Sequence, residues 1–221
     1  MLLRAGTVAT GRELLRPGWI EISEATVTAV GAGEPPRPAD HDAGPSATVV
    51  PGFVDTHVHG GGGASFAGGP AAVAAAANLH RRHGTTTLLA SLVTESPTDL
   101  IRQVEGLAAQ VHDGVIAGIH LEGPWLAESR CGAHDPGLLR DPDPAELDRI
   151  LGAAAGAVRM VTIAPERTGA LEAVRRVMDT NVFGMAATFS PFIAAMRRAG
   201  RGRLVGIASV AGIRGLPGAG A

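Results

Sequence analysis

Two histidines, two residues apart, end an apolar run of the sequence. His57 and His59 follow the apolar segment 49–54 and precede a stretch of glycines. In a β-strand, alternation would place both imidazoles on the same face. Paired neutral imidazoles are good ligands for a divalent transition metal ion. The spacing therefore predicts a metal site, and the alternative interpretation is a pair of ordinary polar histidines.

A carboxylate ends another apolar segment. Glu122 follows the run 115–121, where a carboxylate costs free energy unless it binds a metal ion, a cation or a hydrogen-bond donor. With the histidine pair in the same chain, a shared metal site is the better interpretation. His120 lies two residues earlier and so on the same side of the strand. It either shares the neighbourhood of Glu122 or supports it without binding the metal.

An alternation of apolar runs with amphipathic segments predicts the elements that hold these residues. Strands that are apolar on both faces, alternating with helices, are typical of a parallel sheet with helical crossovers. Active sites in such folds form at the carboxyl ends of the strands, where all three candidate ligands fall. Besides the segment before His57, the expected strands are 85–93, 115–121 and 158–164, and the expected helices are 71–83, 97–112, a segment after Pro144, and 169–177.

The first 48 residues have a different rhythm. Short apolar pieces at 2–3, 19–22 and 27–30 are separated by glycines and polar turns, which predicts short strands. The segment 33–46 is rich in Pro, Ala, Asp and Gly and is expected to be a loop. We therefore expect a small N-terminal β-domain before the alternating region.

Composition excludes several classes of partner. The 221 residues carry a net charge of -2, and no run of basic residues indicates binding to nucleic acid or to an anionic membrane. No segment approaches the ~20 apolar residues of a membrane span, and the first residues lack the apolar core of a signal peptide. The single cysteine, Cys131, fits a reducing compartment. A cytoplasmic protein is expected.

Several segments together resemble a known family. Residues 51–60, Pro-Gly-Phe-Val-Asp-Thr-His-Val-His-Gly, resemble the first barrel strand of the amidohydrolase superfamily, a motif that dihydroorotase-like and imidase-like relatives share. A narrower resemblance, to the N-acetylglucosamine-6-phosphate deacetylase family, rests on two motifs. They are Gly-Ile-His-Leu-Glu-Gly-Pro-Trp at 118–125 and Cys-Gly-Ala-His-Asp-Pro at 131–136. The segments 83–89 and 161–166 resemble the same family. The resemblance covers about residues 1–175.

The resemblance implies a fold, a metal and a substrate. It implies a (β/α)₈ TIM-like barrel behind a small β-domain, in which His57, His59 and Glu122 are metal ligands and Glu122 is able to bridge two ions. The ion would be Zn²⁺ or another divalent metal, which lowers the pKa of water toward neutrality for attack on the N-acetyl carbonyl. The substrate would be a phosphorylated amino sugar contacted near Ala133 and His134, and the assembly a homodimer.

Other parts of the family pattern have no counterpart here. The family uses two further histidines as ligands and an aspartate as general acid and base. The last histidine of this chain is His134, and Asp179, the only acidic residue after Glu172, lies in a context that does not match. We therefore assign no catalytic residue and expect the activity of the chain to be impaired.

The last residues resemble a different family. Segments 178–185 and 202–212 resemble an internal piece of a short-chain dehydrogenase/reductase, with Asn181 and Ser209 at its motif positions. The chain contains no tyrosine and no nucleotide-binding glycine loop, so no nicotinamide cofactor is expected. The sequence thus predicts an incomplete barrel with a Rossmann-derived tail, divided as 1–48, 49–176 and 177–221. The alternatives are a dehydrogenase fragment and an inactive hybrid product.

Overall fold

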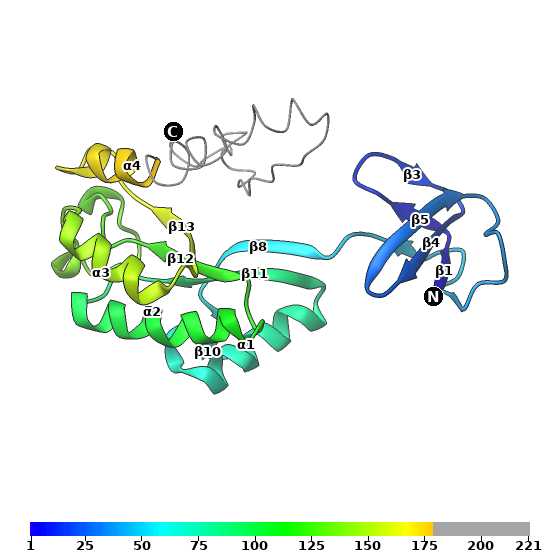
Figure 1. Ribbon diagram of the computed structural model, residues 1–221, viewed down its shortest axis with the longest axis horizontal. Coiled ribbons are helices and arrows are strands. Elements are labelled where there is room, and N and C mark those ends of the chain that lie inside the picture. The colour runs from blue at the N-terminus through cyan, green and yellow to red at the C-terminus, as the bar shows by residue number, and fades with distance from the viewer. Residues whose placement is uncertain (179–221) are drawn as a thin grey trace, which may run out of the picture. The chain divides into compact units, whose positions relative to one another are not determined.

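The computed structural model describes residues 1–178, in which short strands precede an alternation of strands and helices (Figure 1). The strands are β1 (Leu2–Ala5), β2 (Thr7–Ala9), β3 (Leu14–Leu15), β4 (Gly18–Ser23), β5 (Thr26–Ala32), β6 (His41–Asp42), β7 (Thr48–Val49), β8 (Phe53–Val58), β9 (Gly60–Gly61), β10 (Ala64–Ser65), β11 (Thr85–Leu92), β12 (Gly118–Glu122) and β13 (Val158–Thr162). The helices are α1 (Pro70–Arg82), α2 (Pro97–His112), α3 (Pro144–Ala154) and α4 (Ala170–Met178), with short 3-10 helices η1 (Phe66–Gly68), η2 (Glu128–Arg130) and η3 (Pro136–Leu138).

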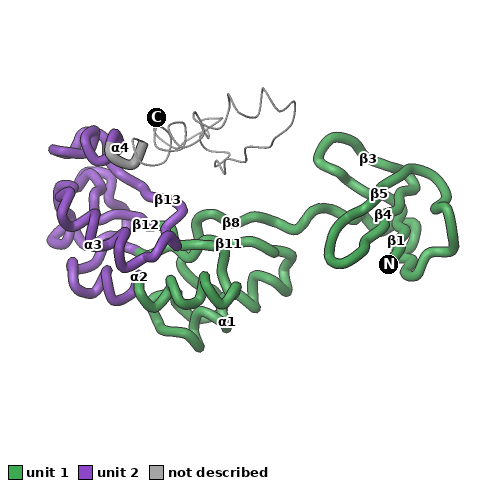
Figure 2. The backbone as a smooth tube through the Cα atoms, in the orientation of Figure 1, with its two compact units in different colours: residues 1–92, 105–120 green, residues 93–104, 121–221 purple. Residues whose placement is uncertain are grey.

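The chain divides into two compact units. One contains residues 1–92 and 105–120, and the other contains residues 93–104 and those from 121 onward (Figure 2). The division runs through helix α2 and strand β12, so both elements are covalently continuous from one unit to the other.

The N-terminal strands form two small sheets in the first unit. Their orders are β5-β4-β1-β6 and β3-β2-β7, which confirms the three strands expected from the sequence. The expectation of a plain loop at 33–46 is wrong in one detail. Strand β6 lies within that segment, because Leu3 and Arg4 of β1 pair in parallel with His41 and Asp42. A pairing partner some 38 residues away leaves no local signal.

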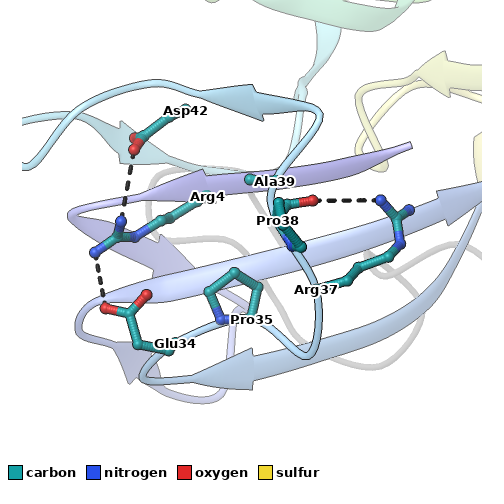
Figure 3. Close-up of a pocket in the computed structure, with 7 residues that line it drawn as sticks. All are labelled: Arg4, Glu34, Pro35, Arg37, Pro38, Ala39 and Asp42. Carbon is teal, nitrogen blue, oxygen red and sulfur yellow. Dashed lines mark hydrogen bonds and ion pairs between the residues drawn. The ribbon is translucent and has the colours of Figure 1, made fainter.

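Arginines and carboxylates line a surface cavity of about 370 Å³ beside these strands (Figure 3). Arg4 is paired with Glu34 at 2.9 Å and with Asp42 at 3.6 Å. Arg37 donates to Asp40 at 3.1 Å, and this hydrogen bond, followed by one from the backbone of Leu2, lowers the pKa of the Asp40 carboxyl. Each arginine is already neutralised by carboxylates, so we interpret the cavity as a paired surface network.

The central sheet has the order β13-β12-β11-β8. Strands β8 and β11 pair in parallel, as the alternation of strands and helices predicts. Leu88, Ala90 and Leu92 of β11 are buried. Burial on both faces does not hold for β8, where Phe53 and Val54 are 57% and 66% exposed, because β8 is the edge strand of the sheet within residues 1–178. Those residues contain no closed barrel.

Local capping signals explain where the helices begin. Helix α1 begins at Pro70, and Gly84, with a φ of +97°, follows its end. The side chain of Asp143 accepts hydrogen bonds from the backbone of Ala145 and Glu146 at the start of α3. At α2, the Ser96 hydroxyl accepts from the Asp99 backbone at 3.1 Å and donates to the Asp99 carboxylate at 2.7 Å. The expected bounds of α1 and α2 are confirmed within one residue, and α3 begins where a helix start was expected.

We expect Ser96→Ala to lower the melting temperature by about 2–4 °C, the shift for losing one N-cap in a domain of this size. The substitution leaves the Asp99 backbone N–H without its side-chain acceptor. Differential scanning calorimetry measures the shift. Thr98→Ala, at an exposed position in the same helical turn, is the control and should change the melting temperature less.

Acid should diminish the effect of Ser96→Ala. The hydrogen bond from Ser96, followed by that from Arg102, lowers the pKa of Asp99. A carboxyl whose pKa is lower in the folded state adds stability above its unfolded pKa, and this is lost as pH falls through the folded value. The difference between the two proteins should therefore shrink below about pH 4. An equal difference at neutral and acidic pH would show that the hydroxyl does not act on the ionised carboxylate.

No helix within residues 1–178 is long and apolar enough to cross a membrane. The predicted dehydrogenase-like tail lies outside the described residues, apart from the end of α4. The division into segments 1–48, 49–176 and 177–221 stays a prediction.

Candidate metal centre

Strand β8 carries the first candidate ligand, and the second follows immediately after it. His57 lies inside the strand, which ends at Val58. His59 was expected to lie on the same strand, and it follows the strand by one residue. The Asp55 carboxylate accepts a hydrogen bond from the His57 backbone at 3.1 Å. The two Nε2 atoms are nevertheless 3.2 Å apart, and the planes of the two rings meet at 67°. The two imidazoles therefore lie at one place, as predicted, although only His57 belongs to the strand.

Glycines after His59 permit a close approach of backbone segments. Helix α1 contributes His80, whose Nε2 lies 2.9 Å from the Gly60 carbonyl oxygen. Gly60 has a φ of +152°, and a Cβ atom there would lie 2.1 Å from the carbonyl oxygen of Ala64. A side chain at Gly60 would therefore displace the hairpin of β9 and β10 that follows the histidine pair.

Ser91 connects the histidine strand to His120. Its hydroxyl oxygen accepts a hydrogen bond from the Val58 backbone at 3.0 Å and lies 2.9 Å from Nδ1 of His120. His120 is fully buried, and its ring lies edge-on to that of His57 with centroids 4.6 Å apart. These contacts pack His120 against His57, while the two roles that the sequence left open for His120, both of them next to Glu122, stay predictions. Ser91, which lies near the end of the apolar strand β11, was not predicted from the sequence.

Glu122 ends strand β12, and the loop that follows supplies its partner. Nε2 of His134 lies 3.3 Å from the Glu122 carboxylate. On the other side of the ring, Nδ1 of His134 lies 3.1 Å from the backbone nitrogen of Thr94 and 2.7 Å from its hydroxyl. Thr94 was also missed. Its only sequence signal is its position, as a hydroxyl residue just past the end of β11.

The structure brings the three predicted ligands together. One ligand atom from each of His57, His59 and Glu122 lies within 4.8 Å of the others. Two nitrogens at 2.0–2.1 Å from a tetrahedral zinc ion are about 3.3–3.4 Å apart, and the two Nε2 atoms are separated by 3.2 Å. Two imidazoles and a carboxylate are donors that Zn²⁺ accepts. The residues therefore fit a divalent metal ion, while their role as ligands stays a prediction.

The segment predicted to contact substrate is a loop of two short 3-10 helices, η2 and η3. Ala133 is exposed, whereas the His134 side chain is only 6% exposed. The backbone of His134 donates to the Cys131 carbonyl at 3.1 Å, and Asp135 caps η3 through the Gly137 backbone. The loop thus presents Ala133 to solvent while it holds His134 against Glu122. Contact of these two residues with substrate stays a prediction.

Two arginines hold this loop in place. Arg140 is bound to the buried Glu146 carboxylate at 2.9 Å, and it also donates to the carbonyl oxygens of Glu95 and Leu138 at 2.8 and 2.9 Å. Arg167 donates to the Leu126 carbonyl oxygen and to the Asp141 carboxylate. The contacts with Glu95, Leu126 and Asp141 were not predicted, because they join residues that are 26 to 45 positions apart in the sequence.

Comparisons with known proteins identify the family of the chain. Residues 48–197 match the amidohydrolase family. The structure is similar to that of a mutant N-acetyl-D-glucosamine-6-phosphate deacetylase from Mycobacterium smegmatis in complex with N-acetyl-D-glucosamine-6-phosphate. The TM-score is 0.77 and the identity 64%, covering 79% of this chain and 46% of that one.

Two curated relatives extend the comparison. The N-acetylgalactosamine-6-phosphate deacetylase of Escherichia coli O157:H7 is 29% identical over 177 residues, 77% of this chain and 47% of the relative. The N-acetylglucosamine-6-phosphate deacetylase of Bacillus subtilis (strain 168) is 26% identical over 192 residues, 82% of this chain and 48% of the relative. The chain therefore spans about half the length of the relatives it matches.

Proposed function

Because this chain belongs to the amidohydrolase family, we propose that it serves in the metal-dependent hydrolysis of the N-acetyl group of N-acetylglucosamine 6-phosphate. The observation that carries the proposal is the 64% identity with the Mycobacterium smegmatis deacetylase, whose structure contains that compound. The same likeness favours a deacetylase over the dehydrogenase alternative. The proposal concerns the activity of the whole protein, and it includes a cytoplasmic location and a homodimeric assembly.

His57, His59 and Glu122 would hold the divalent ion, which we propose to be Zn²⁺. The donor atoms and the 3.2 Å separation of the two Nε2 atoms support this choice. A bound divalent ion polarises a carbonyl oxygen and lowers the pKa of water toward neutrality. The carboxylate of Glu122 has two oxygens and is therefore also able to bridge two ions.

The remaining residues position these ligands and the substrate. Ser91 ties the strand that carries His57 to the buried His120, and this restricts the orientation of the His57 ring. We propose that the backbone around Ala133 contacts the sugar and that His134, in the same segment, also binds it. Arg140 and Arg167, which hold the loop in place, keep both residues near Glu122.

A second substrate is favoured by one specific relative. The Escherichia coli O157:H7 protein is an N-acetylgalactosamine-6-phosphate deacetylase. The two sugars differ only in the configuration of one hydroxyl group, and the amide to be hydrolysed is the same. A deacetylase acting on the galactosamine compound is therefore the second candidate.

The test is release of a primary amine from each sugar phosphate by the chain loaded with Zn²⁺. We expect slow hydrolysis that is faster with N-acetylglucosamine 6-phosphate than with N-acetylgalactosamine 6-phosphate. Glu122→Gln should abolish hydrolysis of both, because the neutral amide is a much weaker metal ligand at the same place. Unphosphorylated N-acetylglucosamine is the control for the phosphate group.

The outcomes separate the two candidates. Faster hydrolysis of N-acetylgalactosamine 6-phosphate would identify that compound, and not N-acetylglucosamine 6-phosphate, as the substrate. A chain that binds Zn²⁺ through these residues, yet leaves both phosphorylated sugars intact, would overturn the proposed activity.

A further inference from the structure

Thr94 presents two donors to one ring nitrogen of His134. Its backbone nitrogen is 3.1 Å from Nδ1, and its hydroxyl oxygen is 2.7 Å from the same atom. A backbone N–H can only donate, so Nδ1 must be the acceptor and must lack a proton. In the neutral ring the proton then lies on Nε2, since the hydrogen bond at one nitrogen decides the tautomer at the other.

The proton-bearing nitrogen faces the candidate ligand. Nε2 of His134 lies 3.3 Å from the Glu122 carboxylate oxygen. The His134 side chain is 6% exposed and Thr94 is 4% exposed, so water has little access to compete for the contacts between them, while the Glu122 side chain is 23% exposed. Thr94, His134 and Glu122 therefore form a directed chain in which each donor has an acceptor.

Gly123 leaves room for this chain. A Cβ atom at position 123 would lie 2.3 Å from the Thr94 hydroxyl oxygen, and Gly123 has a φ of +86°, which residues with a side chain rarely adopt. The glycine directly after Glu122 thus lets the Thr94 hydroxyl lie over the backbone next to the candidate ligand. This close packing fixes the position of the hydroxyl relative to Glu122.

We propose that Thr94 is a positioning residue, which holds His134 in the tautomer that donates from Nε2 toward Glu122. The inference rests on the proposed function, because it concerns the orientation of a ligand of the proposed metal site. A hydrogen bond that orients a metal ligand raises the affinity of the site and restricts its geometry. Thr94 acts through His134 and does not touch the metal or the substrate.

The first experiment measures the tautomer directly in the full chain without metal or substrate. The chain has eight histidines, and ¹⁵N-labelled histidine gives each ring a distinct pair of nitrogen signals in long-range proton–nitrogen NMR spectra. The signals that disappear in His134→Gln belong to His134. We expect them to show Nδ1 without a proton and Nε2 with one.

Thr94→Val tests the hydroxyl alone, because valine has nearly the same shape and keeps the backbone N–H. Because the backbone N–H remains as one of the two donors to Nδ1, we expect the wild-type tautomer to stay the major form in this variant and a minor population with the proton on Nδ1 to appear. Thr94→Ser, which has both donors, should restore the wild-type spectrum. Thr98→Val makes the same exchange at an exposed position nearby and should leave the spectrum unchanged. A proton on Nδ1 in the wild type, or a Thr94→Val spectrum without this minor population, would overturn the proposal.

Calorimetric titration with Zn²⁺ alone measures the consequence for the metal site. We expect the Kd of Thr94→Val to rise about fivefold, which corresponds to the loss of one hydrogen bond of ~1 kcal/mol, and the Kd of Thr94→Ser to remain close to wild type. A serine variant that fails to restore affinity would indicate a packing role and contradict the proposal. If the predicted tautomer is observed but the chain deacetylates neither sugar phosphate, the proposed function is overturned and the role of Thr94 is not.

Discussion

Replacing His57 with alanine is expected to lower the affinity for Zn²⁺ by more than about 100-fold. Loss of a residue that only orients a metal ligand already lowers metal affinity by about 10–100-fold, and loss of a ligand itself should cost more. His57 and His59 have Nε2 atoms 3.2 Å apart, so the substitution removes one of two adjacent nitrogen donors. Wild-type chain dialysed against metal-free buffer should retain less than one zinc ion per chain, and the variant none. Atomic emission spectrometry of the dialysed proteins measures both values.

His112→Ala is the matched control for this loss. His112 is exposed in the last turn of α2, so its removal should leave the zinc content at the wild-type value. Circular dichroism of both variants would show whether the fold is retained. Equal zinc in His57→Ala and the wild type would assign the metal to other residues and refute the predicted site.

Replacing Arg140 with methionine is expected to destabilise the chain by about 3–5 kcal/mol, the usual cost of leaving one partner of a buried ion pair without the other. The side chain of Glu146 is only 5% exposed, and its carboxylate accepts hydrogen bonds from Arg140. The carbonyl oxygens of Glu95 and Leu138 lose a donor as well. Because domains are stable by only ~5–15 kcal/mol, urea unfolding followed by circular dichroism should register a large change.

The double variant Arg140→Met with Glu146→Leu identifies the cause. Removing both charges takes away the buried, uncompensated carboxylate, so the double variant should recover much of the lost stability. Arg102→Met provides the control, since Arg102 is 69% exposed in its pair with Asp99, and such pairs contribute at most ~1 kcal/mol. If the double variant were as unstable as Arg140→Met, the contacts to the two carbonyl oxygens would be the main contribution of Arg140.

The capping signals of the sequence determined where the helices lie. Helix α2 extends from Pro97 to His112, as expected from the Ser96 cap and the apolar periodicity that follows. These signals are reliable because a cap and the helix it begins are separated by only a few residues, so the sequence contains both partners side by side.

The candidate ligands were likewise predicted from local signals. Alternation along one strand placed His57 and His59 together, and the end of an apolar run selected Glu122. The exact end of β8 was not predicted, yet the two imidazoles converge because a spacing of two residues keeps them on the same side. The resemblance to a known family supported this assignment, and it also gave the expected chemistry.

Only the tertiary structure decided which residues support these ligands. Thr94 meets His134 across 40 residues of sequence, and Ser91 meets His120 across 29. The exposure of Phe53 and Val54 likewise depends on the position of β8 in the sheet. A hydroxyl at the end of a strand has the same local signal whether it faces water or a buried imidazole. Its partner is fixed only when the chain folds and brings distant segments into contact.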